Sequence, residues 1–418
     1  MIKINSVRQL AEKVFVSNDT RETGLNNNDL IIGSSGSGKT GGYVIPNLQN
    51  ISGSMMVSDT KGLLCRMFGE SLKKKGYKVY TLDFVNPMKS CGYNPLRSIR
   101  RKEDGKFREQ DVLSLANTII PTLDIREPFW ERAAAGYLAF LIAFATETLD
   151  IENQNMSSIC NLHHTFIRKD GNLSFLSWAE ENPDTFAAKK FFEIQSSGNA
   201  DKMWSSIMEF ANRALEPFEF EEAKNIFDSN DSIDISSLGR KKTVVFLNTS
   251  DTDRSFDQLV NIFHTQALQQ LCAEADKNPD GRLKVPVRLI LDDFAAGTRI
   301  PDFDKVISVI RSREISVSII LQSMTQLESM YNHAEAMTIV NNCDHLLYLG
   351  SQDTETAQFV GYRAFKTPES VLCTPRNKAI LITNGEKAVV VDKIKPYSTM
   401  KKEVKTNCQY DDETEKAG

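Results

Sequence analysis

A glycine-rich loop that ends in a lysine and a threonine carries the clearest chemistry in the chain. In DLIIGSSGSGKT, four residues separate Gly33 from Gly38, and Lys39 and Thr40 follow directly. Glycines let backbone N–H groups converge on phosphates, while the lysine reaches the β- and γ-phosphate oxygens and the hydroxyl ligates Mg²⁺. The spacing therefore predicts a P-loop for a nucleoside triphosphate, with Thr40 as a metal ligand. The predicted phosphate-binding residues are Gly33, Ser34, Ser35, Gly36, Ser37, Gly38, Lys39 and Thr40.

A second interpretation of the same loop is a dinucleotide site. Residues 36–41 match Gly-x-Gly-x-x-Gly, and Asp59 ends the next apolar run, where an acid that binds ribose is expected. The lysine–threonine pair at the P-loop offset and the early Pro46 in the following helix favour the triphosphate. A flexible glycine–serine linker is the third interpretation, and it fits poorly between a strand and a helix.

Two adjacent aspartates end the apolar run VRLILDD, residues 287–293. P-loop enzymes hold Mg²⁺ with an aspartate at the end of such a strand, and a neighbouring polar residue orients the attacking water. Asp292 is accordingly predicted to be a metal ligand and Asp293 to be the catalytic base or water-positioning residue. An ordinary strand that ends in acidic residues has the same pattern. The two aspartates therefore indicate a metal site mainly because the chain also contains a P-loop.

Three further polar residues are candidates for catalysis. Gln322 ends the apolar run SVSIILQ, and its amide can orient a water without titrating. Arg311 and Arg313 precede that run, and an arginine that reaches a neighbouring subunit's site raises ATPase rates by ~10³–10⁵. The alternatives are a polar residue that caps a strand and ordinary surface arginines.

These residues require a sheet whose strand ends meet at one edge. Most of the predicted strands are apolar on both faces and alternate with helical stretches, which predicts parallel strands buried between layers of helices. The last two runs are joined by Asn-Gly-Glu, which predicts a β-hairpin. The predicted fold class is α/β with a mostly parallel sheet. The predicted strands are 29–33, 54–59, 77–84, 242–248, 287–293, 316–322, 345–350, 378–383 and 387–392.

The strand pattern stops between about residues 110 and 230, where PFWERAAAGYLAFLIAFATETL and MWSSIMEFANRALEPF have helical periodicity. We therefore expect an all-α domain inserted into the α/β core. The expected limits are a lead-in at 1–25, a discontinuous core at 26–110 and 231–396, the all-α insertion at 111–230, and a disordered tail at 397–418.

The composition is that of an ordinary globular protein, with 41% hydrophobic and 25% charged residues. The net charge of −5 excludes a chain coated with nucleic acid but allows a local DNA-binding pore or loop. Seven scattered cysteines without a Cys-x-x-Cys pair indicate reduced thiols. The apolar stretch 133–145 is shorter than the ~20 residues that span a bilayer, so we expect a buried helix and no spanning segment.

The chain resembles the TraG-like coupling proteins of type IV secretion systems over most of its length, up to about residue 395. The resemblance implies a RecA-like P-loop core with ATP and Mg²⁺ as cofactors, and it suggests an ATPase that acts as a DNA translocase. The segments that carry it are GLNNNDLIIGSSGSGKT, VIPNL, VSDTKGLL, YNPLRSI, EPFWERA, SLGRKKTVVFL and LILDDFAAGTRIPDFDKVISVIRSREISVSIILQSMTQL.

The resemblance also implies partners and a location. The expected partners are a relaxase with its DNA, expected to be single-stranded, and subunits of the secretion channel. We expect a homo-hexamer, with a monomer in isolation as the alternative, on the cytoplasmic side of the cell membrane. The helical insertion is expected to face the relaxase and the secretion machinery. A non-processive ATP-binding docking module and an FtsK/HerA-type translocase stay open as alternatives.

Three features depart from the family pattern. Only a short stretch precedes Gly33, where the family usually has a transmembrane region, so this segment is expected to be either missing or naturally absent. Thr60 stands where proline is usual in Asp-Pro-Lys-Gly. Asp293 stands where glutamate is usual, and its carboxylate reaches about 1.5 Å less far, the length of one C–C bond.

Overall fold

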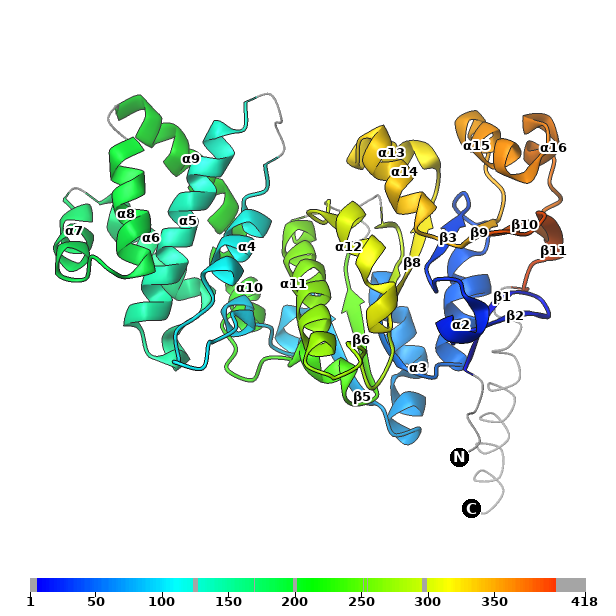
Figure 1. Cartoon of the computed structure of the whole chain (residues 1–418), viewed down its shortest axis with the longest axis horizontal. Helices are drawn as coiled ribbons and strands as arrows, with labels where there is room; N and C mark the ends of the chain where they lie inside the picture. The colour runs from blue at the N-terminus through cyan, green and yellow to red at the C-terminus, as the bar shows by residue number, and fades with distance from the viewer. Residues whose placement is uncertain are drawn as a thin grey trace, which may run out of the picture.

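The computed structural model describes residues 6–122, 127–168, 170–197, 201–250, 252–253, 255–294 and 299–395. The expected disordered tail, 397–418, lies outside the described residues. A large sheet and a group of helices lie side by side (Figure 1). The nine strands of the large sheet have the order β11-β10-β9-β3-β8-β7-β4-β6-β5. They are β3 Asp29–Ile32, β4 Ser54–Ser58, β5 Lys78–Asp83, β6 Thr243–Asn248, β7 Val287–Leu291, β8 Ile315–Leu321, β9 His345–Tyr348, β10 Lys378–Thr383 and β11 Val389–Asp392.

The predicted strands are confirmed, and so is their direction. The strands from β9 to β5 run parallel to one another, whereas β10 pairs antiparallel with β9 and with β11. The Asn-Gly turn predicted between β10 and β11 is confirmed, with Gly385 at φ 81°. The carboxyl ends of the parallel strands therefore meet at one edge of the sheet, called here the carboxyl edge; the other is the amino edge.

Helices cover both faces of the sheet. Alternate residues of a strand point to opposite faces, and Leu30 and Ile32 belong to one apolar core while Ile31 belongs to the other. Helix α11 contributes to the first core, through Phe263, and α3 to the second, through Phe68. The helices and short turns of this part are α2 Ile45–Gln49, α3 Leu63–Lys74, α11 Asp257–Asp276, α12 Phe303–Val309, α13 Met324–Met330, α14 His333–Asn341, α15 Thr354–Ala364, α16 Pro368–Leu372, η1 Thr40–Val44, η2 Thr60–Gly62, η3 Pro87–Lys89, η4 Pro95–Ser98, η6 Ile235–Gly239 and η8 Arg311–Arg313.

A group of helices lies to one side of the sheet (Figure 1). Helix α5 passes through its centre, with residues from Tyr137 to Ala143 buried, so the predicted buried helix is confirmed. Among the described residues, no helix is long and apolar enough to cross a membrane. The domain limits, 111 and 230, stay predictions. The helices are α4 Glu109–Ile119, α5 Phe129–Thr148, α6 Met156–Ile167, α7 Asn172–Glu181, α8 Phe186–Ser197, α9 Asp201–Glu219 and α10 Glu221–Phe227, with η5 Ile151–Asn153 between α5 and α6.

The N-terminal lead-in forms a β-hairpin that was not predicted. Strand β1 Val7–Ala11 pairs antiparallel with β2 Val14–Ser17, and the short helix α1 Thr20–Thr23 follows. The sequence pattern hides β1 because one of its buried residues is Arg8, which is 2% exposed. A buried arginine requires a partner inside the protein, and Arg8 has one in another strand.

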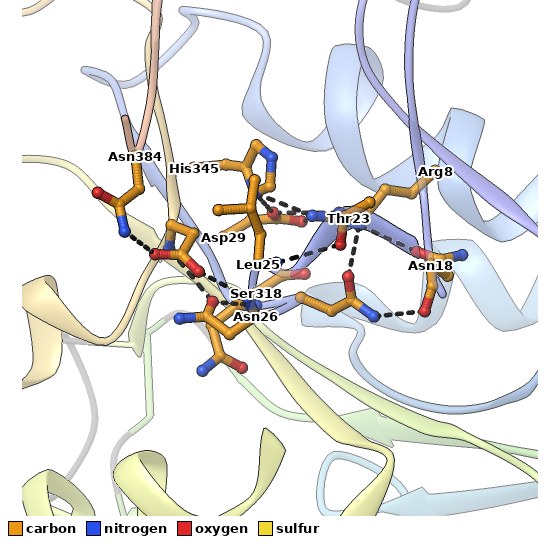
Figure 2. Close-up of polar contacts among 12 residues, drawn as sticks. Arg8, Asn18, Thr23, Leu25, Asn26, Asp29, Ser318, His345 and Asn384 are labelled. Atoms are coloured by element: carbon orange, nitrogen blue, oxygen red, sulfur yellow. Dashed lines mark hydrogen bonds and ion pairs between the residues drawn. The ribbon is translucent and has the colours of Figure 1, made fainter. Parts of the chain in front are cut away.

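The partner is Asp29, the first residue of β3, which is 1% exposed (Figure 2). Arg8 Nε donates to both carboxylate oxygens at 3.1 and 2.9 Å, and Arg288 Nη1 of β7 donates to one of them at 3.1 Å. The Tyr43 hydroxyl, in η1 beyond the P-loop, donates to the same carboxylate at 2.6 Å. Burial alone would raise the pKa of Asp29, but the two guanidinium charges outweigh it and hold this pKa below its ordinary value.

Strands β8 and β9 join the same network from either side of β3. Ser318 and His345 are the register partners of Asp29 on these strands. Arg288 also donates to the Ser318 hydroxyl, and Arg8 Nη2 lies 3.0 Å from His345 Nδ1. Because an arginine can only donate, His345 accepts at Nδ1 and is neutral. One carboxylate thus connects the amino ends of the strands whose other ends carry the predicted site.

Candidate nucleotide-binding site

The predicted phosphate loop lies between β3 and η1, at the carboxyl edge. Gly36 and Gly38 have φ values of 75° and 98°, a conformation that favours glycine. A Cβ added to Gly33 would lie 2.3 Å from Ser37 Oγ and 3.0 Å from Leu349 Cβ, so the loop is too tight there for a side chain. The glycine spacing seen in the sequence thus has a direct steric cause.

The Lys39 ammonium group folds back over this loop. Its Nζ atom donates to the carbonyl oxygens of Gly33 at 2.8 Å and Ser34 at 3.3 Å. The loop is anchored to its neighbours by the backbone bonds from Gly33 N–H to the Leu321 oxygen and from Ser34 N–H to the Gly350 oxygen. The lysine therefore lies at the loop, in the position that a phosphate-binding role requires.

The structure brings the two predicted metal ligands together. The Thr40 hydroxyl donates to Asp292 Oδ2 at 3.0 Å, although the two residues are far apart in the sequence. Burial and the neighbouring Asp293 charge raise the pKa of Asp292, while the Thr40 hydrogen bond and Lys39 partly offset this rise. A bound cation would therefore favour the charged form of Asp292.

Asp293 and Gln322 also lie next to each other, at the ends of neighbouring strands β7 and β8. The Gln322 side-chain amide donates to Asp293 Oδ1 at 3.3 Å, and Asp293 N–H donates to Asp292 Oδ1 at 3.0 Å. Asp293 has φ 50°, in the left-handed region that few residues other than glycine adopt. This backbone conformation sets the direction of the short carboxylate and could not be predicted from the residue type.

The structure does not bring Arg311 and Arg313 to the P-loop of their own chain. Both lie in η8, before β8 and hence at the amino edge, whereas the P-loop lies beyond the opposite ends of the strands. Arg313 Nε forms an ion pair with Asp276 at 2.9 Å, and Arg311 Nη2 donates to the Gly24 oxygen. A catalytic role of either arginine is therefore possible only on a nucleotide bound to another subunit.

Lys393 is a neighbour of the phosphate loop that the sequence did not reveal. It follows β11, and its Nζ atom donates to the carbonyl oxygens of Ser37, at 3.3 Å, and of Leu349. Burial lowers the pKa of Lys393. The next residue also packs against this region, because a Cβ added to Gly42 would lie 3.3 Å from the Ile394 oxygen. A single lysine after a hairpin has no sequence signal that links it to a P-loop.

The dinucleotide interpretation is wrong for two structural reasons. The Asp59 carboxylate accepts the backbone N–H groups of Leu64 and Cys65, each at 2.8 Å, and so stabilises the start of α3. Strands β8 and β7 separate β3 from β4, so Asp59 does not lie beside the loop as a ribose-binding acid would.

The donor set fits Mg²⁺ that arrives with a nucleotide. Mg²⁺ is usually held by one or two protein oxygens, with phosphate oxygens and waters in the other positions. The Thr40 hydroxyl and the Asp292 carboxylate supply such a pair. Over the described ranges, no cluster of three or more His, Cys, Asp or Glu side chains could hold a metal ion alone.

Comparisons with known proteins agree with this geometry. The family model described as "Type IV secretory system Conjugative DNA transfer" matches residues 4–364. Protein VirD4 from Rhizobium rhizogenes and from Agrobacterium fabrum are each 21% identical over 334 residues, which cover 79% of this chain and 48% of the relative. The chain thus spans about half the length of the curated relatives it matches.

Solved structures show the same fold. The bacterial conjugative coupling protein TrwBdeltaN70, in its unbound monoclinic form, is 16% identical, with a TM-score of 0.69 over 94% of this chain and 89% of that one. Plasmid coupling protein TrwB in complex with ADP and Mg²⁺ is 17% identical, with a TM-score of 0.65 over 88% of this chain and 85% of that one. The likeness confirms the predicted α/β core with a mostly parallel sheet and added helices.

Proposed function

Because the chain belongs to the type IV secretory system conjugative DNA transfer family, we propose that it is an ATP-driven DNA translocase that couples a relaxase–DNA substrate to a type IV secretion channel. The observation that carries the proposal is the meeting of Lys39, Thr40 and Asp292 at one edge of the sheet. TrwB has been solved with a non-hydrolysable ATP analogue and with ADP and Mg²⁺, which supports ATP and Mg²⁺ as the cofactors.

The proposed roles follow from the contacts of each residue. Backbone N–H groups of the loop beyond Ser34 bind the phosphates, because those of Gly33 and Ser34 already bond to neighbouring carbonyl groups, and Lys39 exchanges its two carbonyl contacts for phosphate oxygens. Thr40 and Asp292 hold Mg²⁺. ATP bound here would supply the phosphoryl group that water attacks, and its Mg²⁺ would neutralise the charge that develops during transfer.

Asp293 and Gln322 act on the attacking water in this proposal. The Gln322 amide donates to one oxygen of the Asp293 carboxylate and fixes its orientation. The other oxygen then accepts the proton of the water. An amide in this position orients its partner at any pH, because it does not titrate.

The proposal includes assembly and partners. The chain forms a homo-hexamer at the inner face of the cell membrane, and Arg311 or Arg313 acts on the nucleotide of a neighbouring subunit. The helical part, 111–230, faces the relaxase and the channel subunits. Association with the membrane depends on an N-terminal segment or on a partner. The net charge of −5 requires that basic DNA contacts be local.

The test is ATP hydrolysis with and without single-stranded or double-stranded DNA, at concentrations that support assembly, together with DNA transfer in cells. We expect DNA to stimulate hydrolysis and Lys39→Ala to abolish hydrolysis and transfer. A Lys39→Ala protein that still supports transfer would identify an ATP-binding docking module. Hydrolysis that neither form of DNA stimulates would contradict the translocase. Copurification of a relaxase separates the coupling role from that of an FtsK/HerA-type translocase.

A further inference from the structure

Two aromatic side chains project from the C-terminal end of α15 and are almost fully exposed. Tyr362 is 87% exposed and Phe365 is 96% exposed. The cationic residues Arg363 and Lys366 alternate with them in the sequence. We call these four residues the aromatic knob. Figure 1 shows that α15 and α16 lie on the side of the sheet away from the helical part.

The backbone at Phe365 makes its exposure harder to explain by folding alone. Phe365 has φ 54° and ends α15 in the left-handed conformation, and the following Lys366 N–H donates to the Gly361 oxygen at 2.9 Å. Glycine and asparagine fill this position with little strain, whereas a bulky aromatic residue is an outlier there. Such strain usually serves a function when no internal contact requires it.

A groove whose side chains complement the aromatic knob opens beside β5, the last strand at the end of the sheet opposite β10 and β11. It has a volume of about 340 Å³ and lies between the ends of β5 and β6, the start of α11 and the helical part. Phe84, Phe220, Phe256 and Val260 supply apolar surface, and Glu222 and Asp253 supply negative charge. Phe220 and the neighbouring Val85 are 39% and 46% exposed. We call this the acidic groove.

The knob and the groove of one molecule cannot meet. Helix α15 packs on β10, which lies second from one end of the sheet, and the groove adjoins β5, which is at the other end. With neighbouring strands about 4.8 Å apart, the intervening strands separate them by roughly 30 Å or more. A contact between two different surfaces on two copies is heterologous, and repeated contacts of this kind close into a ring when the rotation between copies closes, and otherwise form an open filament.

We propose that the aromatic knob of one copy binds the acidic groove of the next copy, and that this contact assembles the chain head to tail. The inference rests on the ring-forming role in the proposed function and names a surface that builds the ring. Charge complementarity selects this occupant, since the knob brings cations to a groove that carries acids. Lys366 is the better matched cation, because Arg363 already donates to Asn341 and lies over the Phe359 ring.

The first test removes the aromatic groups without disturbing the fold. Phe365→Asn accepts the left-handed backbone, and Tyr362→Ser changes a side chain that is almost fully exposed. The control is Leu173→Ser, which removes an apolar side chain that is 56% exposed on α7. Sedimentation velocity with Mg²⁺ and a non-hydrolysable ATP analogue measures self-association. We expect the double variant to weaken association by roughly 30-fold or more, and the control to match the wild type.

A charge exchange tests the pairing itself. Lys366→Glu and Glu222→Lys should each weaken association several-fold, and the protein with both changes should recover most of it. Lys189→Glu, a reversal on an exposed lysine of α8, is the matched control. Unchanged association in the aromatic double variant, no recovery in the charge exchange, or a wild-type chain that stays monomeric would each overturn the proposal.

Nucleotide binding separates this inference from the proposed function. The knob and groove variants should bind a fluorescent ATP analogue as the wild type does, because their side chains lie outside the P-loop. A wild-type chain that associates but does not bind the analogue would contradict the proposed ATPase and leave the knob contact standing. A chain that binds ATP but associates independently of the knob would contradict only the contact.

Discussion

The side chains of Gln322 and Asp293 form a hydrogen bond of 3.3 Å between the ends of two neighbouring parallel strands. Their strands have adjacent positions in the sheet, so the pairing is fixed by the register between β7 and β8. The amide holds a carboxylate that is one carbon shorter than that of a glutamate. The left-handed backbone of Asp293 and this amide together define where the carboxylate can act.

Asp293→Asn should abolish most hydrolysis while leaving ATP binding intact. The amide keeps the shape of the carboxylate but cannot accept a proton, and a lost general base lowers rates by typically 10²–10⁴-fold. Asp293→Glu should retain activity. Steady-state turnover and titration with a fluorescent ATP analogue measure the two effects. Unchanged turnover in the asparagine variant would remove Asp293 from the mechanism.

Lys393→Met should weaken ATP binding about tenfold or more. The change removes hydrogen bonds from a charged donor to the carbonyl groups of Ser37 and Leu349, and such bonds are worth about 1.5–3 kcal/mol. The P-loop would then lose a fixed shape. Lys393→Arg should restore much of the affinity, and Lys395→Met, at an exposed position two residues later, is the control. Equal affinity in the methionine variant and the wild type would show that Lys393 does not position the loop.

Asp29→Asn should destabilise the whole nucleotide-binding core. The change leaves the guanidinium groups of Arg8 and Arg288 buried without their shared counter-ion, which costs about 3–5 kcal/mol. The free energy of unfolding in urea measures this loss. Asp392→Asn removes the partner of Lys378 at an exposed site and should cost less than about 1 kcal/mol. Similar losses in both variants would contradict the structural importance of the buried network.

Acidification should destabilise the protein below about pH 6.5. Burial lowers the pKa of His264 to about 4, and burial also lowers the pKa of His345. A histidine in the unfolded chain has a pKa near 6.5. Between these pKa values the unfolded chain binds more protons than the folded protein, so the free energy of unfolding decreases as the pH decreases. His264 alone should lower the free energy of unfolding by about 3 kcal/mol as the pH decreases from about 6.5 to about 4.

Thermal unfolding measured from pH 7.5 to pH 5 tests this dependence. His264→Gln cannot take up a proton, so its melting temperature should fall less steeply with pH than that of the wild type. His333→Gln, at an exposed histidine, is the matched variant for the loss of one imidazole. Parallel slopes for His264→Gln and the wild type would show that this group does not titrate on unfolding.

The strands of the core could be predicted because their residues are apolar on both faces, as in VRLIL and HLLYL. The P-loop could be predicted because its glycines meet steric limits, as the space around Gly33 shows. The ionic network could not, because Arg8 and Asp29 are far apart in the sequence and only the fold gives them a common site. A charged residue inside a buried strand, such as Arg288 in VRLIL, was the available signal.

The position of the two arginines that were predicted to be catalytic shows what the sequence could not reveal. Arg311 and Arg313 lie close to Gln322 in the sequence, yet the length of β8 separates them from it. That strand has 7 residues, which span about 23 Å. The direction of the Asp293 side chain could not be predicted from the sequence either, because its positive φ depends on the tertiary surroundings. Residue type and spacing indicate which groups can react, but the strand register decides which of them meet.

The network around Asp29 has a mechanical consequence. A pulling force on the N-terminal hairpin passes through the paired hydrogen bonds of Arg8 to the strand that leads into the P-loop. Separation of the hairpin from β3 would leave the buried Asp29 carboxylate without the Arg8 guanidinium group. The network therefore joins the N-terminal hairpin to the strand that leads into the phosphate loop.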